Sequence, residues 1–178
     1  MRRNKRTTVL ALCGVLAALA VALLFLGGTL PFASIACPVL ASLVLIPVYA
    51  ENGAKWGFLW YVTTSLLGVL LAPDKEAAVL FVFFGYYPML KRQLERLRGR
   101  GLIWAAKLLY VNVAVCAAYG LMIWVFRMEA VSAEFAETQT WMLILLLLMA
   151  NVTFVLYDLL IVRLEVFYCA YLRPKLKL

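Results

Sequence analysis

Two ionisable side chains, Lys107 and Asp158, interrupt long apolar stretches of the sequence. A charge within hydrocarbon costs roughly 2.5–3.5 kcal/mol on insertion scales, so each of these groups needs a partner or a function. Each lies about five residues from the basic end of its stretch. At a helical rise of 1.5 Å per residue, both would lie roughly 7 Å inside the membrane from that end. The matched depth predicts that Lys107 and Asp158 form an ion pair.

Catalysis would need a nucleophile and a base within reach, and Lys107 with Asp158 is the one conceivable pair. Histidine is absent, which removes the usual general base and the commonest transition-metal ligand. The sequence has no phosphate-binding loop and no serine in a Gly-x-Ser-x-Gly setting. Four cysteines are isolated, without the paired spacing of metal or redox sites: Cys13, Cys37, Cys116 and Cys169. We therefore predict small packing cysteines, no enzyme activity, no metal and no cofactor.

Two asparagines, Asn112 and Asn151, lie deeper in the same stretches. The same helical rise per residue places both near the midplane of the membrane. Asn151 precedes Asp158 by seven residues, which places both on nearly the same helical face. The two stretches thus share a polar seam. Polar groups often hold helices together in membranes, whereas the alternative is that some of these residues line a ligand cavity. The residues alone leave both interpretations open.

The segment Pro73-Asp74-Lys75-Glu76 predicts a turn in which Asp74 caps the helix that follows. Lys75 and Glu76 fall in the first turn of that helix. They could bind a polar ligand entering from outside, or serve only in capping.

The segment Gly85-Tyr86-Tyr87-Pro88 combines a small residue, two phenols and a helix-bending proline. Tyrosine is common where membranes meet water, and Lys91 follows one turn later. We interpret these tyrosines as part of an interfacial belt.

Small residues recur along the first apolar stretch and give a smooth face that another helix can approach closely. This face serves either internal packing or a partner. Its members are Ala11, Gly14, Ala18 and Ala22.

The composition is that of an integral membrane protein. The 178 residues are 66% hydrophobic, above the roughly 45–50% of soluble domains. Six spans of about 20 residues with short loops occupy nearly the whole chain and leave no room for an extramembrane catalytic domain. We predict one all-α domain, residues 1–178, with six transmembrane helices in a compact bundle.

The predicted spans are about 7–26, 31–50, 56–72, 77–90, 102–126 and 141–162. Pro38 and Pro47 should kink or interrupt the second span, because proline lacks the backbone donor. The fourth span is short, but Lys91 and Arg92 can snorkel, which allows the helix to continue through Leu97. An amphipathic tail, 163–172, follows the last span.

Basic residues flank the apolar stretches, which is the positive-inside pattern rather than a nucleic-acid-binding surface. They precede the first span, follow the fourth and end the chain: Arg2, Arg3, Lys5, Arg6, Lys91, Arg92, Arg96, Arg98, Arg100, Arg173, Lys175 and Lys177. The acidic segment 128–140 is the predicted outer loop between the last two spans. We predict a multi-pass cell-membrane protein with both termini cytoplasmic.

The first 37 residues share features with a signal peptide: a basic start, an apolar run and small residues near Cys37. The apolar run is longer than a typical signal core, Pro38 follows the apparent cleavage site, and further spans come after it. We therefore expect a first span here.

The arrangement resembles the S component, the substrate-binding membrane subunit, of energy-coupling-factor transporters. The resemblance covers essentially the whole chain. It rests on the length, the six spans, the small-residue face, and the stretch from Ile46-Pro47 to Gly57 that leads into Thr63-Thr64-Ser65-Leu66-Leu67. The turn at 51–55 departs from the Gly-Pro of many relatives, and no vitamin-specific signature is present.

The resemblance implies that the first span docks on a transmembrane coupling subunit and that two ATPases drive the complex. It also implies a vitamin-like organic solute in an outward-facing cavity. The candidate cavity residues are Glu76, Asn112, Tyr119, Trp124 and Asn151, while Lys107 and Asp158 are a structural pair. The alternative is a non-transport membrane scaffold of the cell envelope, with the bilayer as its environment and a purely structural seam.

Overall fold

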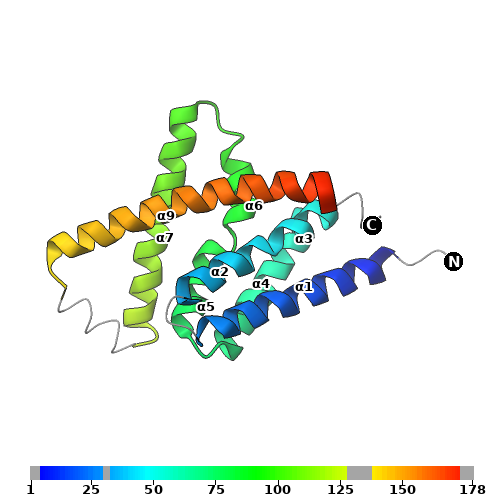
Figure 1. The fold of residues 1–178 in the computed structure, drawn as a ribbon, viewed down its shortest axis with the longest axis horizontal. Coiled ribbons are helices and arrows are strands. Elements are labelled where there is room, and N and C mark those ends of the chain that lie inside the picture. Colours follow the sequence, from blue (N-terminus) through cyan, green and yellow to red (C-terminus); the bar gives the residue numbers. More distant parts are fainter. Residues whose placement is uncertain (1–4, 30–32, 128–137, 173–178) are drawn as a thin grey trace. The chain divides into compact units, whose positions relative to one another are not determined.

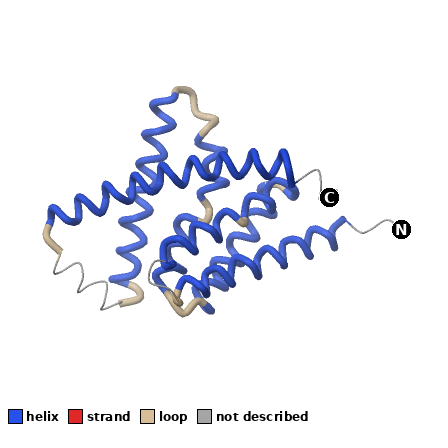
Figure 2. The backbone as a smooth tube through the Cα atoms, in the orientation of Figure 1, coloured by secondary structure: helices blue, strands red, loops and turns tan. Residues whose placement is uncertain are grey.

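A computed structural model describes residues 5–29, 33–127 and 138–172. All regular structure in these residues is helical (Figure 1). Short turns and loops join the helices (Figure 2). The chain divides into two compact units, one comprising Met1–Leu90 with Arg163–Leu178 and the other Lys91–Val162. The prediction of a single domain stays a prediction.

The described part of the first unit contains five complete helices. These are α1 (Lys5–Gly27), α2 (Ala33–Leu43), α3 (Leu45–Asn52), α4 (Ala54–Leu71) and α5 (Lys75–Phe84). α1 packs against α2 and α4, α2 packs against α5, and α3 packs against α4. The packed face of α1 centres on Ala20 and Leu24, which are fully buried.

The second unit is built on α7 (Arg100–Trp124) and most of α9 (Thr140–Phe167). The short helix α6 (Tyr87–Leu94) leads into it. After α9, a π-helical segment (Tyr168–Leu172) belongs to the first unit again.

Among the described residues, five helical segments are long and apolar enough to cross a membrane. They are Val9–Gly27, Ala33–Asn52, Ala54–Leu71, Arg100–Trp124 and Thr140–Tyr171. The predicted fourth span is not one of them, because α5 and α6 have only 10 and 8 residues. Six spans and the sidedness of the termini therefore stay predictions. The basic residues Arg2, Arg3, Arg173, Lys175 and Lys177 and the acidic segment 128–137 lie outside the described residues.

The break in the fourth predicted span falls at Gly85 and Tyr86. Phe58 and Tyr61 of α4 pack on the Tyr86 ring, with centroid distances of 6.1 and 5.5 Å. Tyr87 is fully buried. The belt interpretation is therefore wrong for Tyr87, and the break places the neighbouring Tyr86 ring against α4.

The second predicted span is interrupted as its prolines suggest. α2 ends at Leu43 and α3 begins at Leu45, while Pro38 lies inside α2 without ending it. Pro47 has no amide hydrogen to donate to the carbonyl four residues earlier, Leu43, which is where α2 ends. The local break follows directly from the sequence.

Asp74 caps α5, as predicted. Its Oδ1 accepts a hydrogen bond of 2.9 Å from the amide of Glu76, which satisfies one of the unpaired donors at the helix start. Lys75 turns back, and its Nζ donates to the carbonyls of Val69 (2.9 Å) and Ala72 (3.0 Å). The ammonium thus stabilises the C-terminal end of α4.

Two reciprocal hydrogen bonds attach the end of α9 and the π-helical segment to α3. The Tyr49 hydroxyl donates to the Glu165 carboxylate, and the Tyr168 hydroxyl donates to Glu51 Oε1 at 3.2 Å. Each chain segment supplies one phenol and one carboxylate. Because both bonds join residues more than 100 positions apart, this attachment could not be read from the sequence.

Gly57 lies where α4 crosses α3, and a side chain there would clash. A Cβ at this position would lie 2.8 Å from Tyr49 Cβ and 3.0 Å from Met89 Sδ. We predict that Gly57→Ala lowers the free energy of unfolding by about 1–3 kcal/mol through overpacking. The measurement is thermal unfolding in detergent.

Gly14→Ala is the matched control. No atom lies within 4 Å of a Cβ at Gly14, and alanine favours the helix by up to about 1 kcal/mol. It should therefore be neutral or stabilising. Equal losses in the two variants would contradict the proposed α3–α4 contact.

Candidate functional site

The predicted ion pair is present in the second unit, and it has a third member. Lys107 Nζ lies 2.9 Å from Asp158 Oδ2, and Lys91 Nζ lies 2.7 Å from Asp158 Oδ1. Lys91 also donates to the backbone carbonyl of Asp158 at 2.7 Å. The relative exposures are 1% for Lys91 and 4% for Lys107 and Asp158. One buried carboxylate thus bridges two buried ammonium groups.

Glu95 completes the cluster from its solvent side. Its Oε1 lies 3.2 Å from Lys107 Nζ and 3.8 Å from Lys91 Nζ, and its side chain is 46% exposed. Two ammonium groups and two carboxylates give a formal net charge of zero. We call Lys91, Glu95, Lys107 and Asp158 the charged quartet. Its mutual pairing offsets much of the cost of burying these groups.

The expectation that the Lys91 amine snorkels toward the membrane surface is wrong, because this amine is buried against Asp158. Lys91 and Glu95 are four residues apart, a spacing that brings side chains together on a helix. That spacing was the one feature of the sequence that could have indicated a contact between Lys91 and Glu95. It did not show that Asp158, 67 positions away, would draw the Lys91 amine inward.

Asn112 on α7 and Asn151 on α9 contact each other. Each side-chain amide donates to the side-chain oxygen of the other, at 3.2 and 3.1 Å. Each also donates to a carbonyl four residues earlier in its own helix, at 2.7 Å to Leu108 and 2.8 Å to Leu147. All four amide hydrogens are thus used within the protein. This geometry supports the helix-joining interpretation of the seam over the ligand-binding one.

The other two candidate cavity residues of the second unit lie further along α7. Tyr119 is partly buried. Trp124 is the last residue of α7 and is 84% exposed. At this exposure, the described residues do not enclose the Trp124 ring. A role in solute binding stays a prediction for Tyr119 and Trp124.

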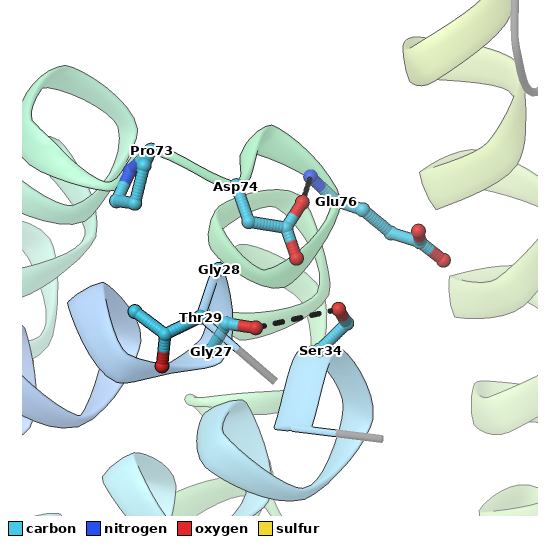
Figure 3. Close-up of a pocket in the computed structure, with 7 residues that line it drawn as sticks. All are labelled: Gly27, Gly28, Thr29, Ser34, Pro73, Asp74 and Glu76. Atoms are coloured by element: carbon cyan, nitrogen blue, oxygen red, sulfur yellow. Dashed lines mark hydrogen bonds between the residues drawn. The ribbon is translucent and has the colours of Figure 1, made fainter. Parts of the chain in front are cut away.

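Glu76 lines a polar pocket in the first unit, with a volume of about 470 Å³ (Figure 3). The pocket is formed where α1 ends and α2 and α5 begin. Its lining residues are Gly27, Gly28, Thr29, Ser34, Pro73, Asp74 and Glu76. We call it the turn pocket.

Asp74 also lines the turn pocket. In Figure 3 its side chain lies between Glu76 and the Thr29 and Ser34 side, whereas the Glu76 side chain extends away from them. The Asp74 Oδ1 caps α5, and Oδ2 has no hydrogen-bond partner among the described residues. Sequence reasoning assigned Asp74 to capping alone and so missed its place in the pocket.

The small-residue face of α1 is exposed. Its four members, Ala11, Gly14, Ala18 and Ala22, all face outward in the structure. Three of these residues, Gly14, Ala18 and Ala22, line an apolar groove of about 710 Å³, with walls formed by α1 and α4. Its lining residues are Gly14, Ala17, Ala18, Val21, Ala22, Phe25, Thr63, Leu67 and Leu71. Packing of this unit uses a different face of α1, so the partner interpretation stands as a proposal.

The cysteines do not approach one another. All four are free thiols, and only Cys37 is buried, while Cys116 and Cys169 are exposed. The packing interpretation therefore holds for Cys37 and is wrong for those two. Within residues 5–29, 33–127 and 138–172, no group of three or more Cys, Asp and Glu side chains could hold a metal ion.

Comparison of the chain with protein-family models, with curated proteins and with solved structures finds no match.

Proposed function

We propose that this chain is a membrane-embedded solute-binding subunit that takes up a small, vitamin-like organic molecule. The observation that supports it is the turn pocket, a polar cavity at the ends of apolar helices. Polar groups that converge on one pocket can fix the orientation of a small-molecule ligand. The chain resembles an S component of an energy-coupling-factor transporter in its span pattern.

The proposed orientation places six spans in the membrane with both termini in the cytoplasm. The turn pocket then opens on the outer face, because it lies at the opposite end of α1 from the basic N-terminal segment. A solute arriving from outside would meet Asp74, Thr29 and Ser34 first. Since carboxylate oxygens accept hydrogen bonds, the polar end of the solute is expected to be an amine or a hydroxyl.

Transport would also require energy from other proteins, since the sequence has no phosphate-binding loop. In the proposal, the exposed small-residue face of α1 contacts a coupling subunit. Separate ATPases then act from the cytoplasmic side. Small residues permit the close helix approach that such membrane contacts use.

Native mass spectrometry of the full chain, purified gently from its own membrane, tests the proposal. A retained small molecule, or a complex with ATPase subunits, would support it. A chain with neither, bound only to cell-envelope proteins, would contradict it.

Asp74→Asn is the sharpest variant for the turn pocket. Asparagine caps helices about as well as aspartate, so stability should be unchanged, while removal of the charge should weaken binding of an amine or hydroxyl solute about tenfold. The readout is the retained fraction of the molecule found by native mass spectrometry. Glu51→Gln is the control, because Glu51 lies on α3 outside the pocket lining and its amide oxygen can still accept the Tyr168 hydroxyl. Equal weakening in both variants would exclude the turn pocket as the site.

A second candidate function is a membrane scaffold of the cell envelope. It is favoured by the polar seam of the second unit. The members of the charged quartet pair with one another, and the Asn112 and Asn151 side chains bond to each other, so neither group needs a ligand to satisfy its polar atoms. A scaffold would retain its protein partners when Asp74 is changed to asparagine. It would also carry no solute.

A further inference from the structure

We propose that the loop between α6 and α7 binds the phosphate groups of anionic lipids at the membrane surface. Three arginines lie here within five residues: Arg96 and Arg98 in the loop, and Arg100 at the first position of α7. All three are exposed. Among the residues that the structure describes, none of the three has an ion-pair partner. This proposal does not depend on solute transport.

The structure separates the basic groups of this region into two sets. Lys91 and Lys107 are buried and neutralised by Asp158 and Glu95. The three loop arginines have no such carboxylates and remain available. A guanidinium group binds phosphate through two parallel hydrogen bonds, which makes arginine well suited to this ligand.

The loop is held in a defined conformation. Glu95, its first residue, is tied to α7 by the 3.2 Å contact with Lys107. The amides of Arg96 and Leu97 donate to carbonyls three residues earlier, at 3.2 and 3.1 Å. Gly99 has a φ of 110°, a conformation that other residues rarely adopt. The backbone that carries the arginines therefore loses little conformational freedom on binding, so that the cost of ordering falls on the arginine side chains.

Apolar side chains beside the arginines favour a lipid over an acidic protein as the partner. Leu97, between two of the arginines, is exposed. Trp104 follows Arg100 by one helical turn, is also exposed, and its ring centroid lies 5.4 Å from Lys107 Nζ. Tryptophan at the level of lipid headgroups is typical of membrane proteins. The loop region thus offers guanidinium groups that can bind phosphate, and next to them in the chain two exposed apolar side chains that suit the membrane interface.

The experiment compares two double variants of the full chain in detergent, each of which lowers the formal net charge from +8 to +6. One is R96Q/R98Q in the loop. The other is K55Q/R163Q, a control that removes two exposed basic groups elsewhere. Phosphatidylglycerol and phosphatidylcholine are added in turn, and native mass spectrometry counts the lipids retained.

The wild-type chain and the control should retain phosphatidylglycerol in preference to phosphatidylcholine. The loop variant should bind phosphatidylglycerol roughly thirtyfold more weakly, with no change for phosphatidylcholine. Thermal unfolding of both variants should match the wild type, which shows that the loop change leaves the fold intact.

Three outcomes would overturn the proposal. Equal weakening in the loop and control variants would show only a general effect of net charge. Displacement of phosphatidylglycerol by millimolar glycerol phosphate would identify a site for free phosphate instead. Unchanged lipid retention, together with loss of a co-purifying acidic protein from R96Q/R98Q, would make the loop a protein-binding surface.

Discussion

Asp158→Leu is expected to lower the free energy of unfolding by about 3–5 kcal/mol. Asp158 is the shared carboxylate of two buried ammonium groups, 2.7 Å from Lys91 and 2.9 Å from Lys107. Its removal leaves both ammonium groups without their main partner, in a region that gives them little water. The measurement is thermal or denaturant unfolding of the purified protein in detergent.

Compensating changes distinguish a structural cluster from a functional one. Lys107→Met combined with Asp158→Leu should be tolerated better than either change alone, as expected for a buried pair. Recovery should be incomplete, because Lys91 then keeps only Glu95, 3.8 Å away. Adding Lys91→Met should restore most of the remaining loss.

Glu95→Gln is the control for the quartet. Its carboxylate is 46% exposed, and exposed ion pairs contribute about 1 kcal/mol or less. Equal damage from the single, double and triple changes would rule out a mutually compensating cluster. It would instead assign Asp158 a role that its two lysines do not share.

Gly14→Leu with Ala18→Leu is expected to abolish assembly with the proposed coupling subunit while leaving the fold intact. Both residues line the exposed groove between α1 and α4, and leucine would fill the space that a partner helix needs. Nothing lies within 4 Å of a Cβ at Gly14, so the larger side chain has room in the isolated chain. Co-purification from the native membrane measures the assembly, with thermal unfolding as the check on folding.

Val15→Phe provides the matched control for this face. Val15 is exposed on α1 but does not line the groove, so added bulk there should not disturb assembly. If the double leucine variant keeps its partners, the groove is not the contact surface. If both variants lose them, the effect is not specific to the small residues.

The helical class and most span positions could be predicted because they depend on local properties. Long apolar runs must satisfy their backbone groups internally in a membrane, which selects helices. Turn residues such as Asp74 and Pro47 act on their immediate neighbours, so the α5 cap and the break between α2 and α3 followed from the sequence. The matched depths of Lys107 and Asp158 identified one long-range contact.

Other features depended on distant contacts that no local pattern specifies. Lys91 is drawn inward by Asp158, and the Tyr86 ring packs on α4 at the break between α5 and α6. The reciprocal bonds of Asn112 and Asn151 showed that these amides are already satisfied. The sequence thus determined most of the helices and the buried pair Lys107 and Asp158, since these follow from local composition. Only the tertiary structure decided which charges neutralise each other and which polar groups remain available, because both depend on the packing of distant helices.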